Sequence, residues 1–556
     1  MSFQSPVSKC RITIPGLGTV DGLQYANGVQ QFCGIPYALL SKRWTRSVLK
    51  TSWEEGHHDG TRLGNDCPSP MIEGDDSDDL VPVPPAAHFS HPREVDELSG
   101  LVMNIVIPHA VKDATKLPVF VYVHGGSLLY GGANLPIFDA VNLVSHSISI
   151  GHPIICVNFN YRVGIGGFLA GEVIARSLEQ DGHQGSGNFG FTDQKVAFDW
   201  VQKYISFLGG DIHNVTAVGE SAGGISISNQ LQSARPPAFH RAVCMSGLSA
   251  AIPPWTMNQH DCFFETVCIH FKIDPAAQDA LDMLRSVPQQ ELANATAEIQ
   301  GVPSGTGNPC MDGWFYLPEI DPRKVNPPPA WLKGFMFGDT YHEGIIFHLN
   351  LLLLEENYQS IREALQSKIR DEAQTDHILR AYDITADLSQ DELFSRTEHM
   401  CGDAIFKIPN YLLANRCATE NLPGDALFLY HFDQRSRLLN ALEGTAYHAH
   451  ELLYLYGNLD NEMSEKEIAM AREFAGAWIR FANGLAPWDA DGERKWMVWG
   501  QDSKKKVMSE DEDEKVRDYT RMKMMLGLEN EGEKVWERWL AGVDALVNRR
   551  SHLFGK

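Results

Sequence analysis

The stretch "TAVGESAGGISI", residues 216–227, places a serine between glycines directly after a run of apolar residues. Gly219 and Gly223 lie two residues before and two residues after Ser221. Glycine is common in this chain, with 48 among 556 residues, so the spacing alone is a weak signal of a nucleophilic serine. The surrounding sequence has to decide between a nucleophile on a tight turn and a serine that lies between glycines by chance.

Short apolar runs recur along the chain, with turn or helix patterns between them. They are rich in Val, Ile and Phe at consecutive positions, which is typical of strands buried on both faces of a sheet. Amphipathic stretches such as residues 192–209 separate several of them. This alternation predicts an α/β fold with a large, mostly parallel central sheet and helices on both faces. The predicted strands cover residues 118–125, 153–163, 214–221, 240–247, 333–340 and 426–433.

The two ends of the chain depart from this central pattern. The first 60 residues predict short strands with glycine turns, which we expect to add antiparallel strands at one edge of the sheet. The tail from residue 464 is charged and is predicted to form an outer layer of helices. Residues 68–99 are rich in Pro and Asp and are not expected to be regular, but no linker divides the chain. We therefore predict a single domain over residues 1–556.

In this setting Ser221 follows a predicted buried strand at residues 215–218 and precedes a segment that can continue as a helix. Strand, tight turn and helix, with glycines at both flanking positions, are the context of a nucleophilic serine. Side chains two residues on either side of so sharp a turn come too close for anything larger than Gly. The turn lifts the hydroxyl out of the sheet and presents the N–H of Ala222 at the start of a helix.

A second glycine-rich stretch, "VYVHGGSLLYGG" at residues 121–132, follows an upstream predicted strand. Its consecutive N–H groups would lie near the carboxyl end of that strand, where small residues can form a hollow that binds an anion. An ordinary glycine turn is the alternative. As an anion site, this stretch would serve the oxyanion that a nucleophilic serine generates.

Four longer motifs resemble the type-B carboxylesterase family of α/β-hydrolases, which includes cholinesterases and fungal extracellular lipases. They follow in the family's order and at similar spacing, so the resemblance covers almost the whole chain and implies an α/β-hydrolase fold. The motifs are "FCGIPYALLSKRW" (32–44), "VNFNYRVGIGGFLA" (157–170), "GNFGFTDQKVAFDWVQKYISFLGGDIHNVTAVGESAGG" (187–224) and "FHRAVCMSG" (239–247).

The resemblance also implies which residues form the catalytic site. Ser221 corresponds to the family's nucleophile. The family's acid, a glutamate after a strand, matches Glu343 in "GDTYHEGIIF", and its histidine matches His448 in "GTAYHAHELLYLYG". The order serine, acid, histidine is that of α/β-hydrolases generally. Without the motifs, nothing would mark Glu343 or His448 as catalytic. The chain holds 21 histidines, and surface glutamates far outnumber catalytic ones. His450 is expected to be a packing or exposed residue.

Further site residues follow from the same resemblance. The oxyanion would be held by the backbone N–H groups of Gly126, Ser127 and Ala222, and Glu220 would border the pocket. Many relatives have a third glycine where this chain has Ser127, so its Cβ narrows the approach to the acyl carbon. The Ser127 hydroxyl is, as a hypothesis, a fourth donor to the oxyanion. No cofactor and no metal are expected.

Two other departures from the family bear on compartment and substrate. Gly100 stands where the family has the disulfide partner of Cys67, so we expect Cys67 to be a free thiol. Residues 68–99 contain one aromatic residue, Phe89, and no tryptophan, which disfavours choline esters because nothing there would hold a quaternary ammonium. The same loop is too acidic for an apolar lid on a lipid surface, since it contains Glu73, Asp75, Asp76, Asp78 and Asp79.

Composition limits the remaining function classes. The net charge of −24 argues against nucleic-acid and anionic-membrane partners, and no apolar run is long enough to span a membrane. The N-terminus has no apolar signal-peptide core, so we expect a cytoplasmic protein, similar to cytosolic fungal members of the family. The favoured function is a serine carboxylesterase acting on a small or medium-sized soluble ester, such as a xenobiotic or secondary-metabolite ester. The alternatives are an amidase or lactone hydrolase with the same triad, and a non-catalytic cholinesterase-like binding protein.

Overall fold

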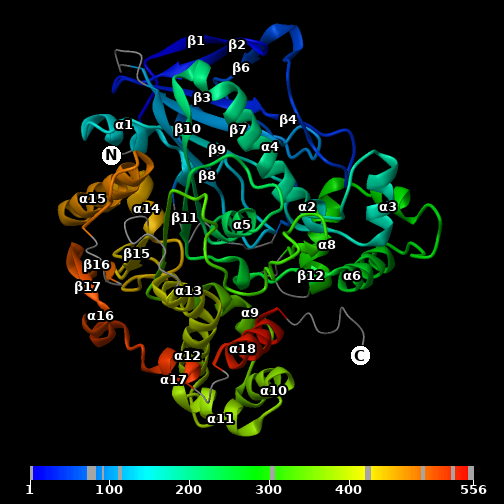
Figure 1. The fold of residues 1–556 in the computed structure, drawn as a ribbon, viewed down its shortest axis with the longest axis vertical. Helices are drawn as coiled ribbons and strands as arrows, with labels where there is room; N and C mark the ends of the chain where they lie inside the picture. The colour runs from blue at the N-terminus through cyan, green and yellow to red at the C-terminus, as the bar shows by residue number, and fades with distance from the viewer. Residues whose placement is uncertain are drawn as a thin grey trace.

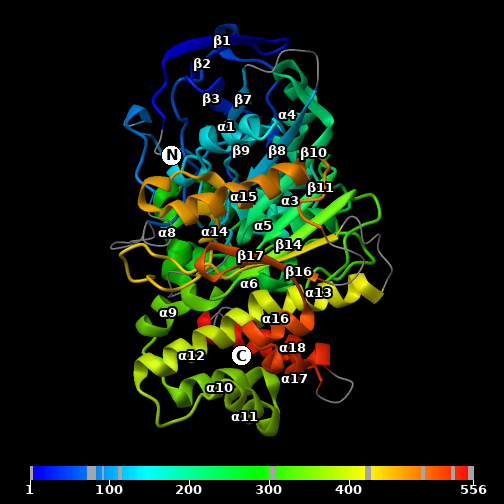
Figure 2. The same cartoon turned by 90° about the vertical axis from the view of Figure 1, so that its left-hand side faces the viewer.

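A large twisted sheet runs through the molecule (Figures 1 and 2). The computed structural model describes residues 4–71, 83–89, 93–109, 116–300, 307–419, 427–489, 495–527 and 532–548. Within these residues the strand order is β1-β2-β3-β7-β9-β8-β10-β11-β14-β15-β16-β17, and β6 pairs with β2. The predicted acidic residues of the 68–99 loop, Glu73, Asp75, Asp76, Asp78 and Asp79, lie outside the described residues.

Seven neighbouring strands form the parallel centre of the sheet. Each of the six strands predicted from apolar runs is present there, because residues that are apolar on both alternations are buried on both faces. The six predicted strands are β8 (Leu117–Val123), β9 (Ile155–Phe159), β10 (Gly210–Glu220), β11 (Arg241–Met245), β14 (Gly334–Thr340) and β15 (Leu427–Phe432), and the seventh strand is β16 (Lys495–Gly500).

The N-terminal edge of the sheet is antiparallel, as the glycine turns predicted. A further strand, β7, joins this edge to β9 in antiparallel orientation, and the short β6 pairs with β2 in parallel. The strands are β1 (Ser8–Ile14), β2 (Gly18–Gln24), β3 (Val29–Pro36), β6 (His57–Asp59) and β7 (Val102–Pro108). Two small sheets lie apart from it: β4 (Ala38–Leu39) with β5 (Val48–Leu49), and β12 (Trp255–Thr256) with β13 (Cys310–Met311).

The prediction that the tail from residue 464 forms only an outer helix layer is wrong. The tail contributes β16 to the parallel sheet and closes its edge with the antiparallel β17 (Lys504–Ser509). Three lysines begin β17, and charges of this kind protect an exposed sheet edge from further pairing. The same charges made the segment look helical. The terminal helix α18 (Gly532–Val547) buries Trp536 and Trp539.

Helices cover both faces of the sheet. Val218 of β10 packs in the same core cluster as α1, α14 and α15, which lie to the left of the sheet in Figure 1. Val215 and Ala217 of β10 belong to the cluster that includes α4 and α5 on the other face. These helices are α1 (Val141–Ser149), α4 (Phe189–Tyr204), α5 (Ala222–Leu231), α14 (Glu451–Tyr456) and α15 (Glu465–Ala482). The predicted fold class is therefore confirmed.

The remaining helices lie around the ends of the strands, and α10, α11, α12, α17 and α18 gather at the lower end in both views (Figures 1 and 2). No helix in the described part of the chain is long and apolar enough to cross a membrane. The helices are α2 (Gly164–Phe168), α3 (Glu172–Gln180), α6 (Met257–His270), α7 (Ala280–Arg285), α8 (Gln289–Gln300), α9 (His348–Leu353), α10 (Tyr358–Ile369), α11 (Glu372–Ala381), α12 (Gln390–Gly402), α13 (Ile408–Thr419), α16 (Glu510–Arg517) and α17 (Thr520–Leu526).

Candidate active site

Ser221 stands on the turn between β10 and α5, as the sequence predicted. Its backbone has φ 53° and ψ −125°, a region that a residue with a Cβ rarely adopts. The Ser221 N–H donates to the carbonyl of Met245 at 2.8 Å, which ties the turn to the end of the neighbouring strand β11. The side chain is partly exposed although the helix that follows is wholly buried. The strained turn therefore holds the hydroxyl at a surface that a substrate can reach.

The two flanking glycines explain why the turn needs this sequence. A Cβ on Gly219 would lie 2.4 Å from the carbonyl carbon of Gly223. A Cβ on Gly223 would lie 2.0 Å from the carbonyl oxygen of Val123, at the end of β8. Both contacts involve backbone atoms, which cannot turn aside as a flexible side chain can. Only glycine fits at either position.

The second glycine-rich stretch lies against Ser221. A Cβ on Gly125 would be 3.1 Å from the Cβ of Ser221, so the two turns are in contact. Gly126 has φ 106° and Ser127 has φ 57°, and this left-handed backbone follows the end of β8. Among the described residues, the N–H groups of Gly126, Ser127 and Ala222 have no protein acceptor. Unsatisfied N–H groups beside a hydroxyl are what an oxyanion site requires.

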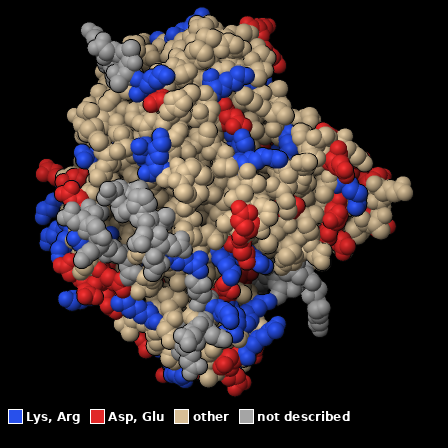
Figure 3. Space-filling model, viewed as in Figure 1, with Lys and Arg blue, Asp and Glu red and all other residues tan. Residues whose placement is uncertain are grey.

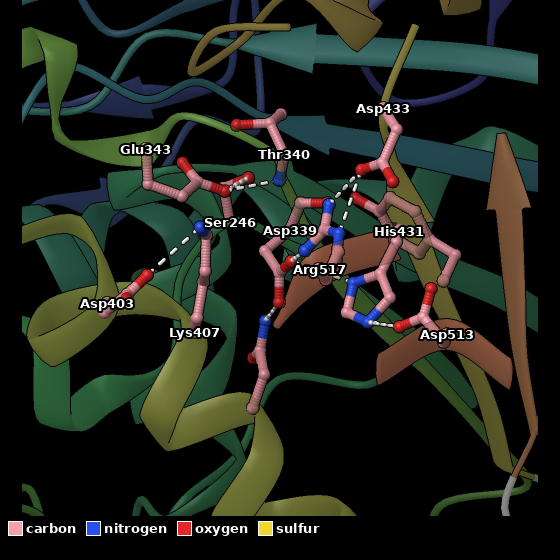
Figure 4. Close-up of polar contacts among 12 residues, drawn as sticks. Ser246, Asp339, Thr340, Glu343, Asp403, Lys407, His431, Asp433, Asp513 and Arg517 are labelled. Atoms are coloured by element: carbon pink, nitrogen blue, oxygen red, sulfur yellow. Dashed lines mark hydrogen bonds and ion pairs between the residues drawn. The ribbon is translucent and has the colours of Figure 1, made fainter. Parts of the chain in front are cut away.

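Glu343 begins a short 3-10 turn, η7 (Glu343–Phe347), directly after β14. Its carboxylate is fully buried and accepts three short hydrogen bonds. Oε1 accepts the Thr340 N–H at 2.5 Å and the Ser246 hydroxyl at 2.7 Å, both drawn in Figure 4. Oε2 lies 2.5 Å from Nδ1 of His448. Glu343 is therefore fixed on one oxygen and directed at the imidazole with the other.

His448 comes from the loop between β15 and α14, and 105 residues separate it from Glu343. Its Nδ1 faces Glu343, while its Nε2 lies 3.2 Å from Oε1 of Glu220. Within the described residues, the Ser221 hydroxyl makes no hydrogen bond. The structure thus brings the predicted acid and histidine into contact and places Glu220, the residue before Ser221, at Nε2, whereas no hydrogen bond joins Ser221 to His448 among the described residues.

Three buried glutamates surround this one imidazole. Burial raises the pKa of Glu220 to about 7, although His448 opposes the effect, and burial raises the pKa of Glu451 well above its usual range. Burial alone would lower the pKa of His448, but the negative charges of Glu220 and Glu343 raise it to about 9. The raised pKa values of Glu220, Glu451 and His448 mean that these three groups can exchange protons with one another.

Sequence reasoning missed three residues of this cluster: Ser246, Glu451 and Phe406. Ser246 ends a predicted strand whose neighbour in the sheet is β14, so its position at the same edge as Glu343 could have been anticipated. Glu451 lies three residues after His448, and its Oε1 is 3.4 Å from the Tyr430 hydroxyl. The ring of Phe406 packs on the His448 ring, with centroids 4.9 Å apart. Nothing in the sequence alone linked Phe406 to the site.

Other predicted features are placed as follows. His450 is buried, stacks on Tyr447 with ring centroids 4.5 Å apart, and packs as expected. Cys67 is buried and unpaired, and Gly100 lies beside Asp66. Phe89 is buried and belongs to the core cluster that includes Tyr25 and Phe138. In the described part of the chain, no group of three His, Cys, Asp or Glu side chains is placed to hold a metal ion.

A second polar network lies next to Glu343, at the end of the same strand (Figure 4). Arg517 pairs with both Asp339 and Asp433, and its Nε is 2.9 Å from Oδ1 of Asp433. His431 bridges Asp339, at 2.9 Å, and Asp513, at 3.2 Å. All five side chains are buried. The network is a structural anchor for the carboxyl end of β14, which carries Glu343 four residues later.

Comparisons with known proteins place the chain in a family. Residues 8–527 match the Carboxylesterase family. "Lipase 3" of Yarrowia lipolytica (strain CLIB 122 / E 150) is 29% identical over 495 residues, covering 86% of this chain and 90% of that protein. "Para-nitrobenzyl esterase" of Bacillus subtilis (strain 168) is 28% identical over 479 residues, covering 82% and 86%. A solved PNB esterase structure has a TM-score of 0.71 at 22% identity and covers 92% of this chain and 99% of its own.

The chain therefore belongs to the carboxylesterase family, and its α/β-hydrolase fold is the one that the motifs between residues 32 and 247 predicted. It is a carboxylic ester hydrolase.

Proposed function

We propose that the protein hydrolyses small or medium-sized soluble carboxylic esters through an acyl-enzyme on Ser221, with His448 as base and Glu343 as its acid partner. The observation that carries this proposal is the 2.5 Å contact between Glu343 and His448, made beside a serine on a strained strand-to-helix turn. A hydroxyl is a weak nucleophile at neutral pH and needs such an oriented base.

In the first half of the reaction, Oγ of Ser221 attacks the ester carbonyl carbon while Nε2 of His448 accepts the hydroxyl proton. The carbonyl oxygen becomes an oxyanion that accepts hydrogen bonds from the N–H groups of Gly126, Ser127 and Ala222. When the ester C–O bond breaks, the imidazolium returns the proton to the leaving alcohol. Water then repeats these steps on the acyl-enzyme, releasing the carboxylic acid and restoring Ser221.

Glu343 keeps its contact with the imidazole throughout this cycle. The hydrogen bonds from Thr340 and Ser246 hold one of its oxygens, so the other can orient the ring and stabilise the imidazolium. Nε2 must exchange its contact with Glu220 for one with Ser221 before it can take the proton. Catalytic hydrogen bonds are often long in an unliganded enzyme and tighten when substrate binds.

The substrate class and the cytoplasmic location are part of the same proposal. Ser127 keeps a Cβ beside the oxyanion site, which favours unhindered esters over those of bulky tertiary alcohols. The unpaired Cys67 supports a reducing compartment. Acidic and basic side chains are interspersed on the face in Figure 3, which supports a small-molecule substrate rather than a nucleic acid.

The proposal is tested by labelling the protein with a fluorophosphonate probe and by assaying p-nitrophenyl esters of increasing acyl length. We expect the wild type to be labelled and to hydrolyse acetate or butyrate esters, and Ser221→Ala to do neither. Ser228→Ala, on the same helix α5, is the matched control and should behave as wild type. Absence of labelling and hydrolysis in the wild type would support the non-catalytic alternative, and faster cleavage of matched anilides or lactones would support the amidase or lactonase.

A further inference from the structure

A π-helical turn interrupts one long helix beside the catalytic histidine. The elements α12, η8 (Asp403–Lys407) and α13 follow one another without leaving helical geometry, since Gly402 and Ile408 both have right-handed helical φ and ψ. Inside η8, the Ile408 N–H donates to the carbonyl of Asp403, five residues back instead of four. Single π turns inside α-helices often occur at functional sites.

The sequence explains why the π turn forms here. Pro409 has no N–H, and its ring would clash with the carbonyl four residues back in a regular α-helix. The Ala404 carbonyl is left without a helical donor, because Ile408 donates to Asp403 and Pro409 cannot donate. The indole N–H of Trp536, from α18, donates to that carbonyl at 2.9 Å. The C-terminal helix therefore satisfies the carbonyl that the π turn frees.

Two further contacts hold the turn in place. The Asp403 carboxylate accepts the Tyr382 hydroxyl at 2.8 Å and pairs with the Lys407 ammonium at 3.0 Å, and the latter contact is drawn in Figure 4. Tyr382 is buried at the end of α11, so the turn is held by contacts from α11, α18 and within itself. A helical segment secured in this way has a fixed rotation about its axis, and so its side chains point in fixed directions.

The side chain that this rotation directs at the active site is Phe406. Its ring packs on the His448 ring with the centroids 4.9 Å apart and the planes at 46°. Glu343 and Glu220 contact the two nitrogens of the imidazole, and the tilted ring of Phe406 packs against the imidazole ring itself. The ring of a phenylalanine carries negative potential on its face and attracts a cation placed over it.

We propose that Phe406, positioned by the π turn, orients His448 and stabilises its imidazolium form during ester hydrolysis. Phe406 is a positioning residue, since it acts through the imidazole rather than on the substrate. This inference rests on the proposed role of His448 as the base. It also explains why the helix contains a π turn at this position, because a regular α-helix would place residue 406 at a different angle about the helix axis.

The test compares Phe406→Leu with Phe406→Tyr, and uses Phe394→Leu as the matched control. Phe394 is a buried phenylalanine on the preceding helix α12, and its ring faces His348 rather than the catalytic histidine. Each variant is assayed for hydrolysis of p-nitrophenyl acetate across pH, and folding is checked by thermal unfolding. The charged groups around His448, which are Glu220, Glu343 and Glu451, are unchanged in all three variants.

For Phe406→Leu we expect kcat/KM on the alkaline plateau of the profile, where the base is neutral, to fall about threefold to tenfold, and the pKa of the base in the kcat/KM profile to fall by about 0.5 to 1. Removing the aromatic face makes the imidazolium less stable, so both quantities move downward. Phe406→Tyr keeps the face and should restore the wild-type pKa even if its thermal stability is lower. Phe394→Leu should lose stability without moving the pKa.

An unchanged pKa in Phe406→Leu, or an equal shift in Phe394→Leu, would overturn the inference. Either result would leave the proposed function intact, because wild-type hydrolysis and Ser221 labelling are measured in the same experiment. Failure of the wild type to hydrolyse any ester would instead overturn the proposed function.

Discussion

Two buried charge clusters lie side by side at the carboxyl end of β14, and they differ in the cationic groups that they contain. In the first, the guanidinium of Arg517 and the imidazole of His431 pair with the carboxylates of Asp339, Asp433 and Asp513. In the second, a single imidazole faces several glutamates with no Lys or Arg among its recorded partners in the described residues. The glutamates are Glu220, Glu343 and Glu451.

The pKa directions follow from this difference. Burial would raise the pKa of Asp339, but His431 and Arg517 more than compensate and lower it. Burial raises the pKa of Glu220 and Glu451, and no permanent cation opposes it. In the first cluster the permanent charge of Arg517 helps to hold the pKa of Asp339 and of Asp513 low, whereas the second cluster has only an imidazole, which can exchange protons with its carboxylates. The two clusters should therefore respond differently to mutation.

The largest expected effect lies in the second cluster. Glu343→Gln should lower kcat by roughly 10³ to 10⁴, because the amide can neither accept the imidazole N–H in the same way nor stabilise the imidazolium. The measurement is steady-state hydrolysis of p-nitrophenyl acetate, with circular dichroism to show that the variant is folded. A decrease smaller than about tenfold would show that another carboxylate serves as the acid partner of His448.

In the first cluster we expect a loss of stability instead. Arg517→Met leaves Asp339 and Asp433 buried without their cation and should lower the free energy of unfolding by about 3 to 5 kcal/mol. Urea unfolding at neutral pH measures this change. Arg323→Met is the control, because Arg323 and Asp321 form an exposed pair that contributes little. A loss of activity in folded Arg517→Met, with no loss of stability, would contradict the division between the two clusters.

The difference between the clusters also shows what the sequence could and could not predict. Glu343 and His448 were predictable because they follow apolar runs in motifs of fixed order, and parallel strands bring their carboxyl ends to one edge. Arg517 was not, since it comes from the charged tail that was predicted as an outer helix layer. The lysines at the start of β17 made this strand hard to predict. Its pairing in the sheet positions the helix that follows, α16, which ends at Arg517.

The contacts of Phe406 were unpredictable for a different reason. A helix of regular periodicity would present a different face at residue 406, and the π turn that changes it depends on Pro409 together with a distant tryptophan, Trp536.

Trp536→Phe removes the indole donor while keeping an aromatic side chain, so we expect the free energy of unfolding to be about 1 to 3 kcal/mol lower because the Ala404 carbonyl is left unsatisfied. Urea unfolding tests this, with Trp539→Phe as the control.

A smaller effect, on the pKa of His448, is expected from replacing Glu220, the carboxylate at its second ring nitrogen. Glu220→Gln removes the charge 3.2 Å from Nε2, so the imidazolium loses a stabilising partner and its pKa falls. The raised pKa of His448 means that the base is neutral only toward alkaline pH in the wild type. The acidic limb of the kcat/KM profile should therefore move to lower pH by about one unit or more in the variant. An unchanged acidic limb would contradict this prediction and show that Glu220 carries no charge when His448 titrates.

The smallest expected effects concern Ser127, which follows the end of β8 in the glycine-rich stretch that contacts Ser221. Its φ of 57° favours glycine, so Ser127→Gly should be about 1 kcal/mol more stable than Ser127→Ala in urea unfolding. If its hydroxyl donates to the oxyanion, both variants should lose about fivefold in kcat on p-nitrophenyl acetate, the size of one neutral hydrogen bond. Turnover equal to wild type in both variants would leave the backbone N–H groups of Gly126, Ser127 and Ala222 as the proposed oxyanion donors. Faster hydrolysis of bulky esters by Ser127→Gly alone would then assign the Ser127 side chain to steric selection, because only that variant removes the Cβ.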